Sequence, residues 1–462
     1  MRRQPVSLPK RRDPTVSEPI ISVSGLRGIV GESLTPEVAM RYVAAFAAEL
    51  PPGPVLVSRD GRATGPMLAA AVTSALAAIG RTVIDADVAA TPTTGVLVRQ
   101  HQAAGGVQIS ASHNPSAYNG LKLFSAEGRV IPAMAGLRVI EQYRNGLPAW
   151  VLHDRVGQVT RLTDTVSDHW SLIAPTVHVD RIRERHFKVL LDANHGAGSV
   201  LGRWLLEQLG CEIILLGETP DGLFEHTPEP TAENLTGVLA RVVAARADVG
   251  FCQDPDADRL AIIDEQGRYL GEEYTLALCV DHELRRHPGP IVTNCSTSRM
   301  SEDLAMKYGV PFYRSAVGEA NVVDVMIERG AVLGGEGNGG IIDPRVGWVR
   351  DSFSGMALVL NAMAARQAKV SQLADELPRY EIVKTKMTVE AAKIPAALAA
   401  LRKHFSDAQI DTLDGLRLDW PGKWLLVRAS NTEPVVRAIA EAPTAAEAQQ
   451  LCDETAKVIA RS

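Results

Sequence analysis

The chain has 462 residues, which is too long for one hydrophobic core, so three or four domains with clefts between them are expected. Its charged fraction of 22% and formal net charge of -6 are ordinary for a globular protein and argue against binding to nucleic acid or an acidic membrane. No apolar run reaches the length of a membrane span, and no signal core follows the N-terminal arginines, so a cytoplasmic protein is expected.

The five cysteines are scattered and odd in number, which is typical of reduced core thiols rather than disulfides. They are Cys211, Cys252, Cys279, Cys295 and Cys452.

Residues 1–19 mix arginines with prolines and predict a flexible arm. From residue 20 to 165, short strands alternate with helices, which predicts a first α/β domain. Thr35 followed by Pro36 is typical of a helix start. The other expected elements are strands at Val55–Val57, Thr82–Ile84 and Val107–Ile109, and helices at Met67–Ile79 and Thr94–His101.

The same alternation of strands and helices begins again after an irregular connection around Gly157–Arg183. It predicts a second α/β domain over 166–268 and a third over 269–378. Long strands after Pro378 predict a smaller α+β domain over 379–462. The predicted fold class is therefore α/β: three consecutive α/β domains with mixed sheets sandwiched by helices, followed by a smaller α+β domain. The expected strands of domains two to four are Phe187–Leu191, Glu212–Leu216, Asp248–Cys252, Ile291–Thr293, Ala331–Leu333, Glu381–Val389, Leu416–Trp420 and Trp424–Val427.

The stretch Gly105–Phe124 holds a serine loop that suits a nucleophile. A short β-branched strand gives way to small polar residues ending at Pro115, which keeps Ser110–Asn114 irregular and the Ser112 hydroxyl accessible. The alternative is an ordinary turn, because Ser and Asn often fill turns for backbone hydrogen bonding alone.

A second loop carries Asp254, Asp256 and Asp258 between two apolar strands. Carboxylates at this spacing can converge on one divalent cation and would repel one another without it, which favours a magnesium site. A calcium EF-hand is an alternative, but Arg259 occupies the position where that loop needs glycine. The segments on both sides of the loop are also predicted strands, whereas an EF-hand loop lies between helices. A solvated acidic turn without an ion is the other alternative.

Two further loops suggest contacts to a sugar phosphate. In the run Gly334–Gly340, glycines allow close backbone approach, while Glu336 and Asn338 offer groups suited to sugar hydroxyls. Between Arg428 and Arg437, two guanidiniums bracket a turn of hydroxyls and amides, which suits a phosphate. Plain turns are the alternative at both places.

With these motifs in this order, the chain resembles the alpha-D-phosphohexomutase family from about Ile20 onward. The resemblance rests on SASHNP, DPDADR, the loop beginning Gly-Glu, and RASNTEPVVR, one from each expected domain. It implies a heart-shaped protein of four domains around one deep central cleft. It also implies a cycle that interconverts hexose 1-phosphate and hexose 6-phosphate through phosphoserine and a sugar 1,6-bisphosphate.

The resemblance also implies the site residues. Ser112 becomes the phosphorylated serine and, with Asp254, Asp256 and Asp258, holds Mg²⁺. Around the phosphoryl group it places His113, Lys122, Arg27 and Arg259. It assigns the sugar and the second phosphate to Glu336, Asn338, Arg428, Ser430, Asn431, Thr432 and Arg437.

Proton transfer from the attacking hydroxyl is predicted to use Lys122 first and His113 second. A protease-like triad at Ser112 and His113 would need a carboxylate that orients the histidine, and none is assignable from the sequence.

The preferred sugar is predicted to be glucosamine phosphate, ahead of mannose and glucose phosphates. The Ser110-Ala111 opening of the serine loop is similar to glucosamine mutases, whereas Asn431 is similar to mannose and glucose mutases. The sugar loop ends in Asn338, Gly339 and Gly340, where common bacterial glucosamine mutases carry serine, glycine and histidine. A small-molecule substrate and a monomer or homodimer are expected. A sugar phosphatase and a non-catalytic sugar-phosphate sensor are the other hypotheses.

Overall fold

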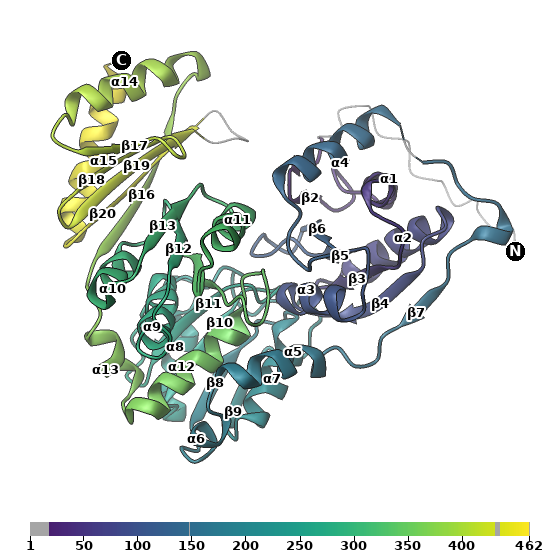
Figure 1. Cartoon of the computed structure of the whole chain (residues 1–462), viewed down its shortest axis with the longest axis horizontal. Coiled ribbons are helices and arrows are strands. Elements are labelled where there is room, and N and C mark those ends of the chain that lie inside the picture. Colours follow the sequence, from purple (N-terminus) through teal and green to yellow (C-terminus); the bar gives the residue numbers. More distant parts are fainter. Residues whose placement is uncertain (1–17, 147, 430–434, 462) are drawn as a thin grey trace, which may run out of the picture.

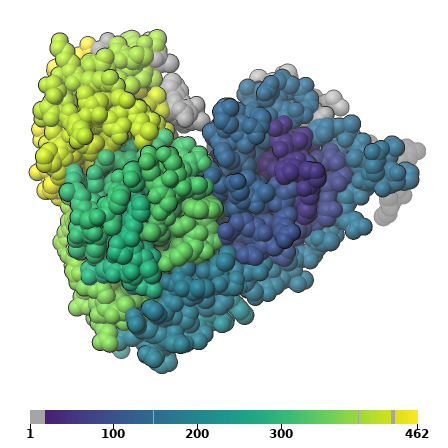
Figure 2. All heavy atoms as spheres, viewed as in Figure 1, coloured from purple at the N-terminus to yellow at the C-terminus, as the bar shows by residue number. Residues whose placement is uncertain are grey.

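A computed structural model describes residues 18–146, 148–429 and 435–461. Four β-sheets follow one another along the chain, each covered by helices (Figure 1). Figure 2 shows that the C-terminal domain and the first domain stand apart above the second and third, so that the molecule is hollowed between them. Within the described ranges, no helix is both long and apolar enough to cross a membrane. The four-domain α/β architecture predicted from the sequence is confirmed.

The first sheet has seven strands in the order β1-β2-β6-β5-β3-β4-β7 and is mixed. One face packs on α1, α2 and α4, and the other packs on α3. Its elements are β1 (Ile20–Ser22), β2 (Gly25–Ile29), α1 (Pro36–Glu49), β3 (Val55–Arg59), α2 (Gly65–Ala78), β4 (Val83–Val88), α3 (Thr91–Gln100), β5 (Gly105–Ile109), β6 (Tyr118–Ser125), α4 (Ala133–Asn145) and β7 (Val159–Arg161).

Local sequence explains how α1 begins. The Thr35 side chain accepts a hydrogen bond from the Val38 amide, and Pro36 occupies the first turn, where no amide donor is needed. Tyr42 and Phe46, four residues apart, then lie on the buried face of the helix.

The second and third sheets each have four strands, in the orders β11-β10-β8-β9 and β13-β12-β14-β15. One large apolar core lies between them and is shared, because α7 of the second unit and α9 and α12 of the third contribute side chains to it. The elements of the second unit are α5 (Ser167–Ile173), α6 (Val179–Arg183), β8 (Lys188–Asp192), α7 (Gly198–Gln208), β9 (Glu212–Leu216), α8 (Thr236–Ala245), β10 (Val249–Gln253) and β11 (Leu260–Asp264). Those of the third are α9 (Glu272–Leu284), β12 (Ile291–Asn294), α10 (Met300–Tyr308), β13 (Phe312–Ser315), α11 (Glu319–Arg329), β14 (Leu333–Glu336), β15 (Gly340–Ile342), α12 (Ser352–Arg366) and α13 (Val370–Asp375).

The fourth sheet is antiparallel throughout, in the order β16-β20-β19-β18-β17. Its helices cover one face, while Trp424 and Leu426 on the other face pack beside Cys295 of the third unit. Glu441 fixes this contact, because its Oε1 accepts from Trp424 Nε1 at 2.7 Å and from the Arg299 amide at 3.0 Å. The elements are β16 (Glu381–Thr388), α14 (Ile394–His404), β17 (Gln409–Asp411), β18 (Leu416–Trp420), β19 (Lys423–Ala429), β20 (Val435–Ala442) and α15 (Ala445–Ala460).

Several local predictions are wrong. The connection around Gly157–Arg183 is not irregular, because it contains β7, α5 and α6, whose His169 and Ile182 are buried by tertiary packing. α3 begins at Thr91 rather than Thr94, since Pro92 belongs to its first turn. The strand expected at Ala331–Leu333 is β14, shifted toward Glu336. Residues 1–17 of the expected arm lie outside the described residues, and the domain boundaries stay a prediction.

The four motif loops occupy equivalent places in the four sheets. Each one joins two neighbouring strands that run antiparallel: β5 to β6, β10 to β11, β14 to β15, and β19 to β20. In the first three sheets, the strand before the loop runs parallel to another neighbour, so the loop lies at the carboxyl edge. This is where ligands bind in open α/β sheets.

Candidate functional site

Ser112 lies three residues after the end of β5 and has a left-handed backbone, with a φ of +50°. This conformation is uncommon for a residue other than glycine and indicates that the surrounding loop holds the serine in place. Its amide donates to Ser110 Oγ at 2.9 Å, and its hydroxyl donates to Asp254 Oδ2 at 2.8 Å. The prediction that its hydroxyl is accessible is wrong, because the acidic loop packs against the serine and buries it. The serine loop and the acidic loop, 142 residues apart in sequence, therefore meet directly.

A buried arginine supports the serine loop from beneath. The Arg62 guanidinium donates to the carbonyls of Ser112 and Asn114, both at 2.6 Å, and to those of Pro115 and Tyr118 at 2.8 and 2.9 Å. Its Nε donates to Asp60 Oδ2 at 3.2 Å, and the same oxygen accepts from the Ser110 hydroxyl. Four carbonyls and one carboxylate thus fix the guanidinium, which in turn fixes the loop.

The three aspartates are fully buried, and one ligand atom from each lies within 4.8 Å of the others. Asp256 and Asp258 are separated by Ala257, whose φ of +55° turns the short loop back on itself. Among the described residues, this is the single cluster of three or more acidic, histidine or cysteine side chains close enough to share a metal ion.

Cations offset part of this negative charge. Lys122 on β6 donates to Asp256 Oδ2 and, at 3.1 Å, to Asp258 Oδ2. Burial opposes charge on Lys122, but Asp256 and Asp258 outweigh it and raise the pKa of its ammonium. Burial and the two neighbouring aspartates raise the pKa of Asp254 well above its usual range.

The donor set fits a divalent cation. Asp256 Oδ1 and Asp258 Oδ1 are buried and have no hydrogen-bond partner among the described residues. Buried carboxylate oxygens without partners are costly, and hard oxygen ligands are those that magnesium prefers. Asp254 Oδ2, which accepts from Ser112, completes a set that could hold the ion beside the serine.

Three other predicted residues surround the serine. His113 Nδ1 lies 3.3 Å from Ser112 Oγ, and burial, Arg259 and Arg27 lower the pKa of this histidine to about 3. Arg27 Nη1 contacts Asn114 Oδ1 at 3.5 Å, and the Arg259 amide donates to Asp254 Oδ1 at 3.2 Å.

A carboxylate does approach the histidine, although none is assignable from the sequence. Glu229 Oε1 lies 4.0 Å from His113 Nε2, which is beyond hydrogen-bond distance. The serine hydroxyl moreover donates to Asp254 rather than to the histidine. The arrangement is therefore not that of a protease triad.

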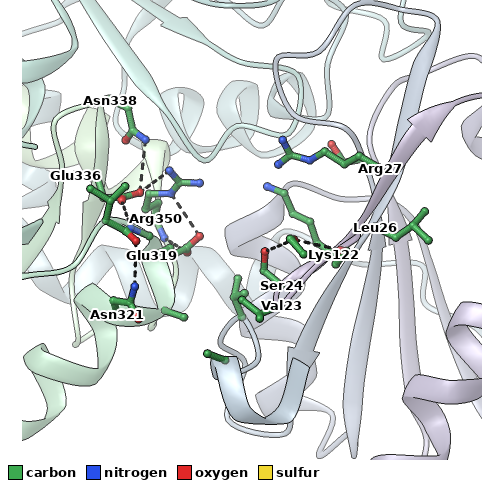
Figure 3. Close-up of a pocket in the computed structure, with 18 of the residues that line it drawn as sticks. Val23, Ser24, Leu26, Arg27, Lys122, Glu319, Asn321, Glu336, Asn338 and Arg350 are labelled. Atoms are coloured by element: carbon green, nitrogen blue, oxygen red, sulfur yellow. Dashed lines mark hydrogen bonds and ion pairs between the residues drawn. The ribbon is translucent and has the colours of Figure 1, made fainter. Parts of the chain in front are cut away.

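A cavity of about 390 Å³ lies between the first and third units, which is enough for a small ligand. Figure 3 shows Arg27 and Lys122 on one wall and Glu336, Asn338 and Arg350 on the other. Glu336 is held by protein donors: its Oε1 accepts from Asn294 Nδ2 at 2.7 Å, and its Oε2 accepts from Arg350 Nη1 at 2.8 Å. Asn338 Nδ2 is 3.5 Å from the same Oε2.

The fourth loop is described only at its ends. Ser430, Asn431 and Thr432 lie outside the described residues. Arg437 on β20 is the cross-strand partner of Arg428 on β19 and of Lys386 on β16. These three cations therefore form one row across three neighbouring strands. Arg428 Nη2 pairs with Asp414 at 3.3 Å, and Asp414 accepts from the amide of Val317, which lines the cavity.

Three important residues carry no signal in the sequence. Arg62 lies in an ordinary polar turn, and Arg350 precedes the helix cap Asp351. Thr91 is the first residue of α3, and its hydroxyl donates to Asp256 at 2.5 Å. Each one acts on a group far away in the chain, so local spacing could not reveal it.

Family models match nearly the whole described chain, in order. They are described as phosphoglucomutase/phosphomannomutase alpha/beta/alpha domain I at residues 20–147, domain II at 167–267 and domain III at 272–380, and the C-terminal domain at 383–458.

Individual proteins agree. A phosphoglucomutase/phosphomannomutase of Thermococcus kodakarensis is 36% identical, with 94% of this chain and 97% of that protein covered. A Methanopyrus kandleri protein named "probable phosphoglucosamine mutase" is 34% identical, with 95% and 97% covered. The crystal structure of a phosphoglucomutase/phosphomannomutase family protein from Burkholderia thailandensis is 26% identical, with a TM-score of 0.80 and 95% and 98% covered.

Replacing Arg62 tests the support of the serine loop. Arg62→Lys is expected to lower the free energy of unfolding by about 1–3 kcal/mol, because a lysine leaves buried carbonyls without donors. Urea denaturation measures this change. Arg138→Lys is the control, since Arg138 is exposed and forms an ion pair with Glu49 that lysine can keep. Equal losses in the two variants would contradict the special role of Arg62.

Replacing an aspartate tests the metal site. Wild-type protein is expected to bind one Mn²⁺ per chain, followed by electron paramagnetic resonance of the free ion, and Asp256→Asn is expected to weaken this binding at least tenfold, because a ligand charge is lost. Asp264→Asn is the control, since Asp264 is buried at the opposite end of β11 and pairs with Arg268. Unchanged binding in Asp256→Asn would exclude the cluster as the site.

Proposed function

This chain belongs to the phosphoglucomutase/phosphomannomutase family of alpha-D-phosphohexomutases, and we propose that it interconverts glucosamine 1-phosphate and glucosamine 6-phosphate. It is an isomerase that moves a phosphoryl group within a hexose phosphate. The observation that carries the assignment of the site is the contact between the Ser112 hydroxyl and Asp254 at 2.8 Å.

Ser112 is proposed to carry the phosphoryl group and to pass it to the free hydroxyl of the sugar phosphate. The product of this step is a sugar 1,6-bisphosphate, which turns in the cleft and returns its other phosphoryl group to Ser112. Phosphoryl transfer needs positioning and neutralisation of charge more than covalent chemistry. Arg27 and Arg259 lie close to His113, and Lys122 lies against Asp256 and Asp258, so that the three supply positive charge to the site.

Mg²⁺ held by Asp254, Asp256, Asp258 and Ser112 would neutralise charge on the phosphoryl oxygens when bound. Three buried carboxylates would otherwise repel the phosphate. The charge of the same cation would offset this repulsion and let the phosphate lie beside them.

The proton of the attacking hydroxyl is proposed to go to His113. Lys122 is the first choice from the sequence, but Asp256, Asp258 and Thr91 engage its ammonium. The Nδ1 atom of His113 lies 3.3 Å from Ser112 Oγ, close enough to exchange a proton there, and burial and the neighbouring cations, which lower its pKa, make it a weak base that would release the proton again. Lys122 then serves to neutralise charge.

The opposite end of the substrate is proposed to contact the third and fourth domains. Glu336 and Asn338 are placed to meet sugar hydroxyls on one wall of the cavity. The row of Lys386, Arg437 and Arg428 offers guanidinium and ammonium donors for the phosphate that is not transferred, together with the predicted Ser430, Asn431 and Thr432. We propose a monomer or homodimer as the working form.

Replacing the serine tests the reaction. Ser112→Ala is expected to reduce interconversion of glucosamine phosphates to background, because no phosphoryl carrier remains. A coupled assay with magnesium and a trace of bisphosphate measures it. Ser116→Ala is the control, since Ser116 is exposed in the same loop. An undiminished rate in Ser112→Ala would overturn the assignment.

A substrate panel tests the sugar. Glucosamine, mannose and glucose 1-phosphates are compared by kcat/KM, and glucosamine 1-phosphate is expected to have the highest value. A higher value for mannose or glucose phosphate would identify a phosphomannomutase or phosphoglucomutase instead. Release of inorganic phosphate without isomerisation would identify a phosphatase.

A further inference from the structure

Arg350 connects the acidic loop to the sugar loop. It lies between β15 and α12, and its side chain is 11% exposed. Its Nη2 donates to Asp258 Oδ2 at 2.6 Å, and its Nη1 donates to Glu336 Oε2 at 2.8 Å. One rigid guanidinium therefore sets the distance between a proposed metal ligand and a proposed sugar ligand.

A third carboxylate fixes the arginine from the other side. Glu319, at the first turn of α11, accepts from the Arg350 amide at 2.9 Å and lies 3.4 Å from its Nε. Arginine suits this place because its planar fork can address several carboxylates at once, whereas a lysine ammonium acts as a point charge. Figure 3 shows Arg350 between Glu319 and Glu336 on the cavity wall.

Gly340 leaves the space that the arginine side chain needs. A Cβ atom added at residue 340 would lie 2.3 Å from Arg350 Cδ and 2.8 Å from its Cγ, far inside van der Waals contact. The φ of Gly340 is not in the left-handed region, so its backbone does not require glycine. The space requires it, because the stem of Arg350 crosses the face of β15.

We propose that Arg350 is a positioning residue for the proposed mutase reaction, and that Gly340 is glycine in order to admit it. The inference rests on the proposed function. The guanidinium holds Glu336 toward the sugar and leaves Asp258 Oδ1 free for the cation. The sugar wall and the metal loop are thereby coupled through one side chain.

The charge-conserving variant tests the link to the metal. Arg350→Lys keeps one positive charge but loses the fork, so the dissociation constant for Mn²⁺ is expected to rise about tenfold, and kcat/KM to fall about 10–100-fold. Arg345→Lys is the control, since Arg345 pairs with Asp343 and Glu283 in the same segment and does not line the cavity. An unchanged Mn²⁺ dissociation constant in correctly folded Arg350→Lys would overturn the proposal.

A double-mutant cycle tests the link to Gly340. Gly340→Ala alone is expected to lower kcat/KM about as much as Arg350→Ala, because both displace the guanidinium. In the Arg350→Ala background, where Cγ and Cδ are gone and Cβ remains 3.0 Å from the added atom, Gly340→Ala is expected to cost much less than it does alone. Two losses that multiply would show that Gly340 is needed for another reason.

Failure of this inference can be distinguished from failure of the proposed function. If the wild-type protein does not isomerise hexose phosphates, the proposed function fails. Mn²⁺ binding and the unfolding midpoints of the four proteins in the cycle still measure the coupling between Gly340 and Arg350, and additive midpoints would then overturn it. Coupled midpoints with weakened Mn²⁺ binding in Arg350→Lys would support it.

Discussion

Repulsion between three buried carboxylates is the constraint on which this structure depends. Asp254, Asp256 and Asp258 leave one tight loop with no exposed surface, so each must find compensation inside the protein. The compensation comes from other parts of the chain: a hydroxyl from the serine loop, an ammonium from β6 and a guanidinium from the segment before α12. These contacts tie the first and third units to the second at the acidic loop, in addition to the apolar core that the second and third units share.

The recurrence of one local geometry explains how the first three sheets each bring a loop to the same place. In each of these sheets, the motif loop is the short connection between two adjacent antiparallel strands, so its position is fixed on both sides by ladder hydrogen bonds. A loop held in this way can carry a strained residue such as Ser112 without opening. The proposed site residues therefore lie on loops held at the edges of the sheets, while the helices on the faces of the sheets supply stability.

Much of the fold and the core of the site could be predicted from the sequence, because those signals are local. Alternating apolar runs gave most strands, Thr35 and Pro36 gave a helix start, and the spacing of the three aspartates indicated a common ligand. Contacts made across domains carry no such local signature. Arg62, Thr91 and Arg350 have ordinary neighbours in sequence, and only the folded chain brings each to the carbonyl or carboxylate that it serves.

The shared core of the second and third sheets has a consequence for how the chain loses its structure. Side chains of α7, α9 and α12 pack into one apolar cluster, whereas the first sheet and the fourth sheet each have cores of their own. If either the second or the third unit unfolds, the apolar side chains that the other unit contributes to the cluster become exposed to water. The middle of the molecule should therefore melt as a single cooperative block, although two separate sheets compose it.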